Sequence, residues 1–260
     1  MTLDRRSFVA ASLASYFASS AMLGCSAVAE PGQTKTKLYV MGVLHSLHLD
    51  SELYPLELLR AAVRRAAPDV VITEIPPDRI DQALTSFRQS GEIDEPRTEV
   101  FPEYTDVIFP LSQELGFQIV GSAGWTQDIA RNRAAALRRI QNDPTRAEEW
   151  ARHRTAIRTF SRDLAGRGRD PQFIHTPEYD ALVKKSRQPY ERHFDTDLGP
   201  GGWTQINKAH TDLINAELDK ISGQGLTALI TFGTAHKYKI LESVTDRTDI
   251  ELLDVRGLFR

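Results

Sequence analysis

The sequence predicts an α/β fold with a mixed, mainly parallel sheet that is formed from both ends of the chain, with a helical insertion in the middle. The first observation is that short apolar runs alternate with segments of helical periodicity over residues 38–121, an order that indicates parallel strands covered by helices. The second is that residues 125–222 carry mostly helical patterns, and that two more apolar runs follow them. The sheet therefore takes strands from both ends of the chain.

Five apolar runs, several of them rich in valine and isoleucine, account for the expected strands. The run VVITEI is apolar at successive positions, as expected of a strand that is buried on both faces of a sheet. Pro76, Gly121 and Gly233 end three of the runs. The expected strands are residues 38–43, 70–75, 117–121, 226–233 and 250–255.

Helical spacing of leucine and alanine predicts the helices between these strands. Pro55 suits the first turn of one helix, which Pro68 ends, and Pro76 and Pro77 begin the next. Within the insertion, a break is expected at Pro144, and the segment GRGRDPQ is expected to be a loop. The expected helices are residues 55–67, 76–89, 104–115, 125–165 with that break, 177–194, 204–221 and 235–244.

The composition is that of an ordinary globular protein. The chain has 260 residues, of which 41% are hydrophobic and 26% are charged. A formal net charge of −3 gives no basic footprint for nucleic acid. Cys25 is the single cysteine, which excludes a disulfide framework and a cysteine-based metal site from the mature protein.

The first 29 residues have the pattern of a twin-arginine-type signal peptide. Arg5 and Arg6 precede a mildly apolar segment of small residues at 8–23. That segment is short and rich in Ala and Ser, unlike a membrane span. The expected organisation is a signal peptide at 1–29 and a single domain at 30–260, with the helical insertion at about 125–222. The twin-arginine translocase is then a partner during export.

Two cleavage patterns compete at the end of this segment. Ala27-Val28-Ala29 is a small-x-small site for ordinary signal cleavage. Leu23-Gly24-Cys25 is similar to a lipoprotein box, which would give Cys25 a lipid anchor. Both alternatives predict an exported protein of a bacterium, either free in the periplasm or held as a cell-envelope lipoprotein.

Three metal-competent side chains lie at the ends of expected strands. Gly42 and His45 form a Gly-x-x-His motif at the first strand, and Gly233 and His236 form a second one late in the chain. Glu74 ends the second strand. Ligands bind beyond the carboxyl ends of parallel strands, so these side chains are expected to meet at one edge of the sheet. The two glycines allow a sharp turn or a close approach of the backbone to a ligand.

Glu74 carries the strongest physical argument, because its strand is otherwise apolar. A buried carboxylate without a partner costs several kcal/mol, so it needs a cation, a metal or hydrogen-bond donors. A salt bridge to Arg79 is one explanation. A carboxylate with two imidazoles also suits a divalent metal such as Zn²⁺, Mn²⁺ or Fe²⁺, which activates water.

Other polar and aromatic residues have more ordinary explanations. His48 and Asp50 add a second potential ligand set, but a polar loop rim is the favoured interpretation. His210 is expected on a helix as a surface histidine with its hydrogen bonds satisfied. Trp125 and Trp203 are expected to pack in the core or in a lid, with a pocket wall as the alternative.

At His45, Glu74 and His236, with Gly42 and Gly233, the sequence resembles the TraB/TIKI-like superfamily, which is related to ChaN-like and erythromycin-esterase-like proteins. The resemblance extends over most of residues 30–260 in layout. It implies that the two histidines and the glutamate are the active-site residues. Members of this group resemble divalent-metal-dependent peptidases, hydrolyse esters or bind haem.

The chain departs from the superfamily at an Arg-Asn pair that many members carry on the helix before the last motif. The corresponding helix here has Asn207 and Asn215 but no arginine, and the pair Arg131-Asn132 lies much earlier. The residue that stabilises an oxyanion is therefore left open.

These observations predict an exported metal-dependent hydrolase of peptide or ester bonds in which His45, Glu74 and His236 are both catalytic residues and metal ligands. The expected cofactor is Mn, Zn, Co or Fe, and the expected substrate is a small molecule or a peptide. One alternative is an envelope lipoprotein that binds haem or metal without catalysis. Another is a metal-free esterase with His45 as base and Glu74 orienting it. The absence of a Gly-x-Ser-x-Gly motif argues against a serine hydrolase.

Overall fold

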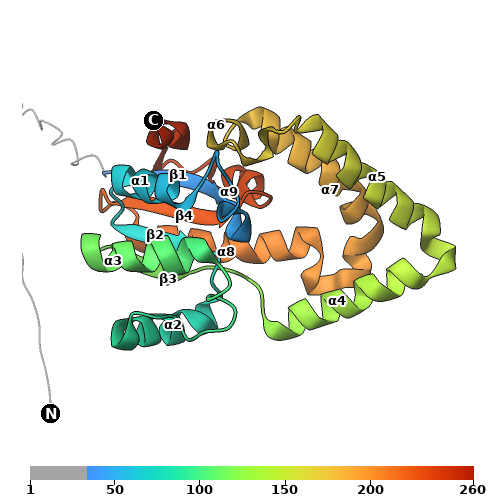
Figure 1. The fold of residues 1–260 in the computed structure, drawn as a ribbon, viewed down its shortest axis with the longest axis horizontal. Helices are drawn as coiled ribbons and strands as arrows, with labels where there is room; N and C mark the ends of the chain where they lie inside the picture. The colour runs from blue at the N-terminus through green and yellow to red at the C-terminus, as the bar shows by residue number, and fades with distance from the viewer. Residues whose placement is uncertain (1–33) are drawn as a thin grey trace, which may run out of the picture. The chain divides into compact units, whose positions relative to one another are not determined.

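The computed structural model describes residues 34–260 and has an α/β fold built on one five-stranded sheet (Figure 1). The strand order is β3-β2-β4-β1-β5, and every pairing between these strands is parallel. The predicted fold class is confirmed. The expected signal peptide, with Arg5, Arg6 and Cys25, lies outside the described residues, so export and lipidation stay predictions.

The strands lie where the apolar runs predicted them. β4 stands between β2 and β1, so a strand from late in the chain joins two early ones. The register runs to Val43 opposite Gly233 and to Thr73 opposite Thr231, which sets the ends of the three strands side by side. The strands are β1 (Thr36–Val43), β2 (Val70–Thr73), β3 (Gln118–Gly121), β4 (Thr227–Gly233) and β5 (Ile250–Leu252).

Helices cover both faces of the sheet, because side chains alternate between the two faces of each strand. Met41 and Val43 of β1 pack in one core, whereas Leu38 and Val40 pack in the other. The first core includes α1 (Leu56–Ala66), α2 (Pro77–Ser90), the π-helical segment η2 (Glu103–Ile108) and α3 (Phe109–Leu115); the second includes α8 (Trp203–Ile221) and α9 (Lys237–Val244).

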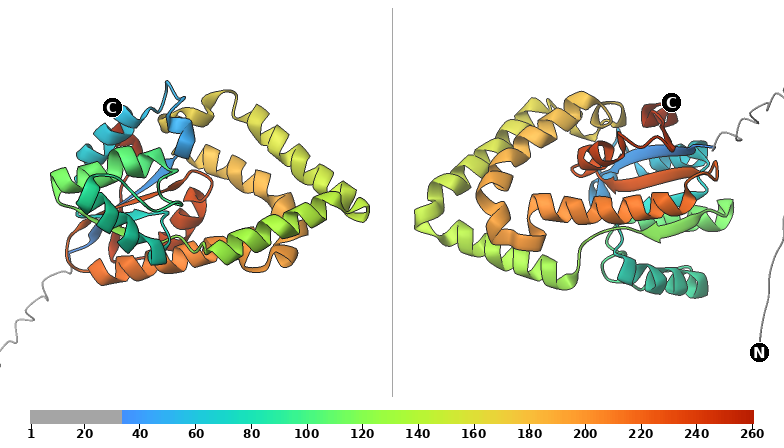
Figure 2. Two further views of the ribbon diagram at one scale, coloured as in Figure 1. Left: turned by 60° about the horizontal axis from the view of Figure 1, so that its bottom comes forward. Right: turned by 180° about the vertical axis from the view of Figure 1, so that it is seen from behind.

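The helical insertion forms an arm that leaves the sheet after β3 and returns to it through α8 (Figure 2). It contains α4 (Gln127–Asn142), α5 (Ala147–Asp163) and α7 (Pro177–Leu198), and α5 packs along α7. The expected break falls at η3 (Pro144–Arg146). The segment expected as a loop contains η4 (Arg167–Arg169) and leads into a short helix, α6 (Pro171–Ile174), which the side chain of Asp170 caps.

No helix within residues 34–260 has the length and apolar character needed to cross a membrane.

Candidate functional site

The three predicted site residues converge at the carboxyl edge of the sheet. His45 follows β1 in the short helix η1 (His45–His48), Glu74 follows β2, and His236 directly precedes α9. His45 Nε2 lies 3.7 Å from Glu74 Oε2, and His236 Nε2 lies 3.8 Å from Glu74 Oε1. The side chain of His45 is 30% exposed, so solvent reaches this edge. The roles assigned to the three residues stay predictions, although their side chains do meet.

Glu74 has little compensation for its burial. The Gly233 N–H donates to Glu74 Oε2 at 2.8 Å, and the Glu74 N–H donates to Tyr104 Oη at 2.8 Å. The suggested salt bridge to Arg79 is wrong, because Arg79 pairs with Asp78 at 3.3 Å. Burial raises the pKa of the Glu74 carboxyl, although the charge of His45 and the Gly233 hydrogen bond oppose the rise. The carboxylate thus lacks a strong cationic partner among the described residues.

Glu103 holds His45. His45 Nδ1 lies 2.6 Å from Glu103 Oε1, so the ring donates its Nδ1–H and its Nε2 faces Glu74. Burial lowers the pKa of His45, but the hydrogen bond and charge of Glu103 outweigh it, and the pKa is raised overall. His45 also has φ 53°, a left-handed conformation that is uncommon outside glycine. The structure around the ring stabilises that conformation.

Glu103 was not among the predicted site residues. Its side chain is fully buried, and it begins η2, one turn of π-helix where a plain helix starting at residue 104 was expected. Such π-helical turns are frequent at functional sites. The available signal was weak: one glutamate between the aromatic residues Phe101 and Tyr104. A carboxylate in such apolar surroundings needs a buried donor, which His45 provides.

His236 is held in the same way from the other side. Its Nδ1–H donates to Asn207 Oδ1 at 2.8 Å, and the Asn207 amide is fixed because its Nδ2 donates to the Trp203 carbonyl at 2.7 Å. The Trp203 ring stacks on the imidazole at 4.8 Å between centroids. Burial, followed by the positive charges around it, sets the pKa of His236 well below its usual value. Its Nε2 is therefore unprotonated and faces Glu74.

His210 lies inside the site, so its assignment to the surface was wrong. It is 0% exposed, and the two rings of His210 and His236 meet edge to face at 4.9 Å. The Gly124 N–H donates to His210 Nδ1 at 2.8 Å, whereas Nε2 has no partner in the described part of the chain. Burial lowers the pKa of His210 to about 4. The neutral ring accepts at Nδ1 and therefore carries its proton on Nε2, as a buried donor without an acceptor.

His48 and Asp50 form no ligand set. His48 is buried, contrary to the polar rim expected, and both its ring nitrogens are used: Nδ1 donates to the Tyr54 carbonyl at 2.8 Å and Nε2 accepts from the Leu44 N–H at 2.9 Å. Asp50 is exposed. Arg131 is also exposed and pairs with Asp128 at 2.7 Å, away from the three converging residues.

Gly42 and Gly233 allow neighbouring side chains to approach the backbone closely, and they do not form turns. Neither Gly42 nor Gly233 has a positive φ. A Cβ on Gly233 would lie 2.6 Å from His45 Nε2, and a Cβ on Gly42 would lie 3.0 Å from Thr234 Cγ2. Gly233 is therefore the residue that lets the His45 ring approach β4.

The donor atoms of His45, Glu74 and His236 are of the kinds that a divalent ion takes, and each histidine lies at bridging distance from Glu74. When both rings are neutral, two Nε2 lone pairs face one carboxylate, and a cation between them would stabilise that arrangement. Separations of 3.7 and 3.8 Å exceed a hydrogen bond, but an ion with bonds of about 2.0–2.2 Å can bridge them. Held Nδ1–H groups of this kind are typical of metal-binding histidines.

One further geometric fact limits how such an ion binds. Among the described residues, the three with ligand atoms all within 4.8 Å are Glu74, His210 and His236, without His45. The His210 tautomer opposes coordination through Nε2, because Gly124 would then donate toward a protonated Nδ1. An ion bound to Glu74 and both predicted histidines therefore requires His45, the most exposed of the three, to move closer.

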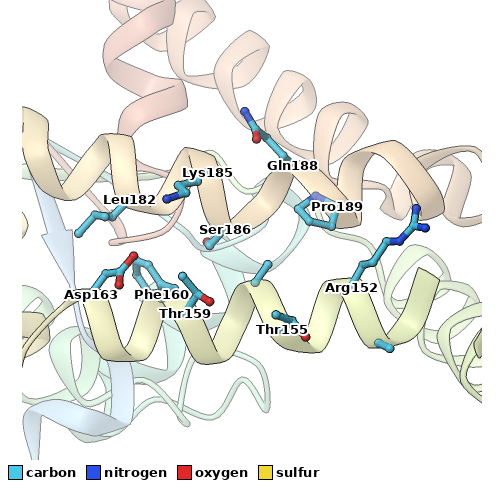
Figure 3. A pocket seen from close by; sticks show the side chains of 12 residues that line it. Arg152, Thr155, Thr159, Phe160, Asp163, Leu182, Lys185, Ser186, Gln188 and Pro189 are labelled. Carbon is cyan, nitrogen blue, oxygen red and sulfur yellow. The ribbon is translucent and has the colours of Figure 1, made fainter. Parts of the chain in front are cut away.

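A separate hollow of about 480 Å³ lies between α5 and α7 (Figure 3). Its walls combine apolar residues such as Phe160 and Leu182 with polar ones such as Lys185. None of the converging residues at the sheet edge lines it, so it is not part of the candidate site.

No protein-family model, curated protein or solved structure matches the chain. The resemblance to the TraB/TIKI-like superfamily therefore stays a prediction.

Proposed function

We propose that this protein is a divalent-metal-dependent hydrolase of peptide or ester bonds. One observation carries the proposal: both oxygens of Glu74 face an imidazole Nε2, at 3.7 and 3.8 Å, and each imidazole has its Nδ1–H committed to an acceptor. With both rings neutral, as metal binding requires, their two lone pairs and the carboxylate favour a cation between them. When bound, a divalent ion supplies Lewis acidity to the scissile carbonyl and to the attacking water.

The residues of the chain have separable roles in this proposal. His45, Glu74 and His236 hold the ion. Glu103 and Asn207 orient the two rings so that each Nε2 faces Glu74, and His45 then moves closer when an ion binds.

His210 has a role of its own. It donates its free Nε2–H to the oxygen that becomes negative as the carbonyl is attacked, a contribution that is large in a buried site. In this proposal His210 stabilises the oxyanion, the role for which the sequence left no residue assigned.

The test is elemental analysis of the purified full-length protein, with hydrolysis of a panel of nitrophenyl esters and peptides. The expected result is one bound Mn, Zn, Co or Fe per chain, lost in Glu74→Gln and kept in the matched surface control Glu242→Gln. A folded protein that binds none of these metals when they are added would contradict the proposal.

A metal-free esterase is the second candidate, and the 2.6 Å contact between His45 and Glu103 favours it. In that mechanism His45 takes a proton from water while Glu103, and not Glu74, orients the ring. Hydrolysis that persists in excess chelator and disappears in His45→Ala selects this candidate. The remaining alternative, haem capture, predicts a Soret band on haem titration that His45→Ala abolishes.

A further inference from the structure

Two arginines of the helical arm lie near His236 without a counter-charge. Arg133 of α4 donates its Nε–H to Tyr190 Oη at 3.1 Å, and Arg187 of α7 lies over the Trp203 ring, 4.3 Å from its centroid. Within residues 34–260, neither guanidinium has a carboxylate within 4.0 Å. Arg187 Nε is buried and has no hydrogen-bond partner among these residues.

Two other partly buried arginines do have carboxylate partners, whereas three more donate to main-chain carbonyls instead. Arg146 pairs with Glu149 at 2.7 Å and with Asp197 at 2.6 Å. Arg247 pairs with Asp219 at 2.7 Å and with Asp249 at 2.6 Å. Removing a charge from water without a partner is costly, so unpaired and partly buried guanidiniums indicate a missing anion.

Aromatic rings hold the two guanidiniums. Arg133 lies 5.7 Å from the Trp125 ring centroid and 5.8 Å from that of Tyr190. The Trp203 ring is fixed because its Nε1–H donates to Tyr238 Oη at 2.9 Å. A guanidinium on a ring face keeps its in-plane N–H groups free, and these match the paired oxygens of a carboxylate or a phosphate.

Trp203 connects this pair to the candidate site. It contacts Arg187 and also stacks on His236, at 4.8 Å between centroids. Arg133 lies 5.7 Å from the Trp125 ring centroid, and that ring meets His210 at 6.2 Å between centroids. His210 in turn meets His236 at 4.9 Å. The Trp203 ring therefore lies between Arg187 and His236, and an anion held by the arginines would lie beside the candidate site.

We propose that Arg133 and Arg187 bind a carboxylate or phosphate group carried by the substrate, beside the His236 end of the site. This inference rests on the proposed function in one respect, namely that the bound molecule is hydrolysed. It narrows the substrate class to anionic peptides or esters whose acidic group lies a short distance from the scissile bond.

Binding is tested first, because it needs no turnover. The probes are succinate and inorganic phosphate at matched ionic strength, with the melting temperature and titration calorimetry as readouts. Wild type and the surface control Arg138→Gln should bind one probe or both, and Arg187→Met should weaken that binding about 10- to 100-fold. Arg133→Met is the second variant if Arg187→Met does not fold. Equal binding by wild type and a folded variant overturns the inference.

Turnover separates this inference from the proposed function. For a matched pair of substrates, one acidic and one its neutral amide, the wild type should prefer the acid. Arg187→Met should remove that preference mainly by raising the KM of the acid toward that of the amide, whereas the surface control Arg138→Gln should keep the preference. If no ester or peptide is hydrolysed but probe binding still depends on Arg187, the proposed function fails and the anion site stands. A preference for the acid that persists in Arg187→Met refutes the anion site.

Discussion

Two groups of histidines in this molecule are held in opposite ways. His48 and His175 use both ring nitrogens on main-chain groups: His175 donates from Nδ1 to the Pro171 carbonyl at 2.7 Å and accepts at Nε2 from the Gly42 N–H at 2.9 Å. His45 and His236 use only Nδ1, and each leaves Nε2 facing Glu74. The first group joins segments of backbone, whereas the second leaves donor atoms for something that the chain itself does not supply.

The largest expected effect comes from removing the group that the free nitrogens face. Glu74→Gln keeps the shape of the side chain but not its charge, so hydrolysis should fall by about 10³-fold. Stability should not fall, because a neutral amide costs less to bury than a carboxylate. Steady-state kinetics and urea unfolding measure the two effects. Activity within about threefold of wild type would show that the free nitrogens serve no catalysis.

For a histidine of the first group we expect a loss of stability without a loss of activity. His175→Ala removes a buried ring and leaves the Pro171 carbonyl and the Gly42 N–H without partners, which should cost about 3–5 kcal/mol of unfolding free energy. Because His175 does not touch Glu74, the folded fraction should keep its kcat/KM. A loss of less than about 1 kcal/mol of unfolding free energy in urea would contradict the structural role of His175.

Glu103→Gln tests how the second group of histidines, His45 and His236, is held. The glutamine amide can still accept a hydrogen bond from His45 Nδ1 but lacks the charge, so activity or metal affinity should fall about 10- to 100-fold. The control is Glu114→Gln, which changes an exposed carboxylate paired with Arg64. Equal activity of the two variants would mean that Glu103 only fills space.

Between neutral and mildly acidic pH, the smallest expected effect is a dependence of stability on pH. Burial lowers the pKa of His175 to about 3, so the unfolded chain, near 6.5, takes up the proton first. Stability from this group is therefore present above pH 6.5 and is lost toward pH 3, at about 1.4 kcal/mol per pH unit. Urea unfolding between neutral and mildly acidic pH should show a shallower loss for His175→Gln. Parallel curves for the two proteins would contradict the prediction.

The residues at the edge of the sheet could be predicted from the sequence, but the glutamate that orients His45 could not. Strands are recognised by their apolar runs, and parallel topology then places the residues after β1, β2 and β4 at one edge, so His45, Glu74 and His236 were found. Glu103 depends on a π-helical turn, a local irregularity of small energy that no periodicity reveals.

The burial of the polar residues of α8 can be predicted from their positions along the helix. Asn207 and His210 fall on the same helical stripe as Ile214 and Leu218, all of them buried. Polar side chains on an apolar stripe need buried partners, and here those partners are His236 and Gly124. Helical position alone, without the stripe, suggested a surface location for His210.

The place of β4 in the sheet also bears on the order in which the chain assembles at the ribosome. β1 pairs with β4 and β5, so the first strand to be synthesised has no neighbour until residues near 233 have emerged. β2 and β3 can pair early, but the sheet closes only when translation is almost complete. The edge that carries the two histidines and Glu74 consequently cannot be complete before the central strand β4 has been synthesised.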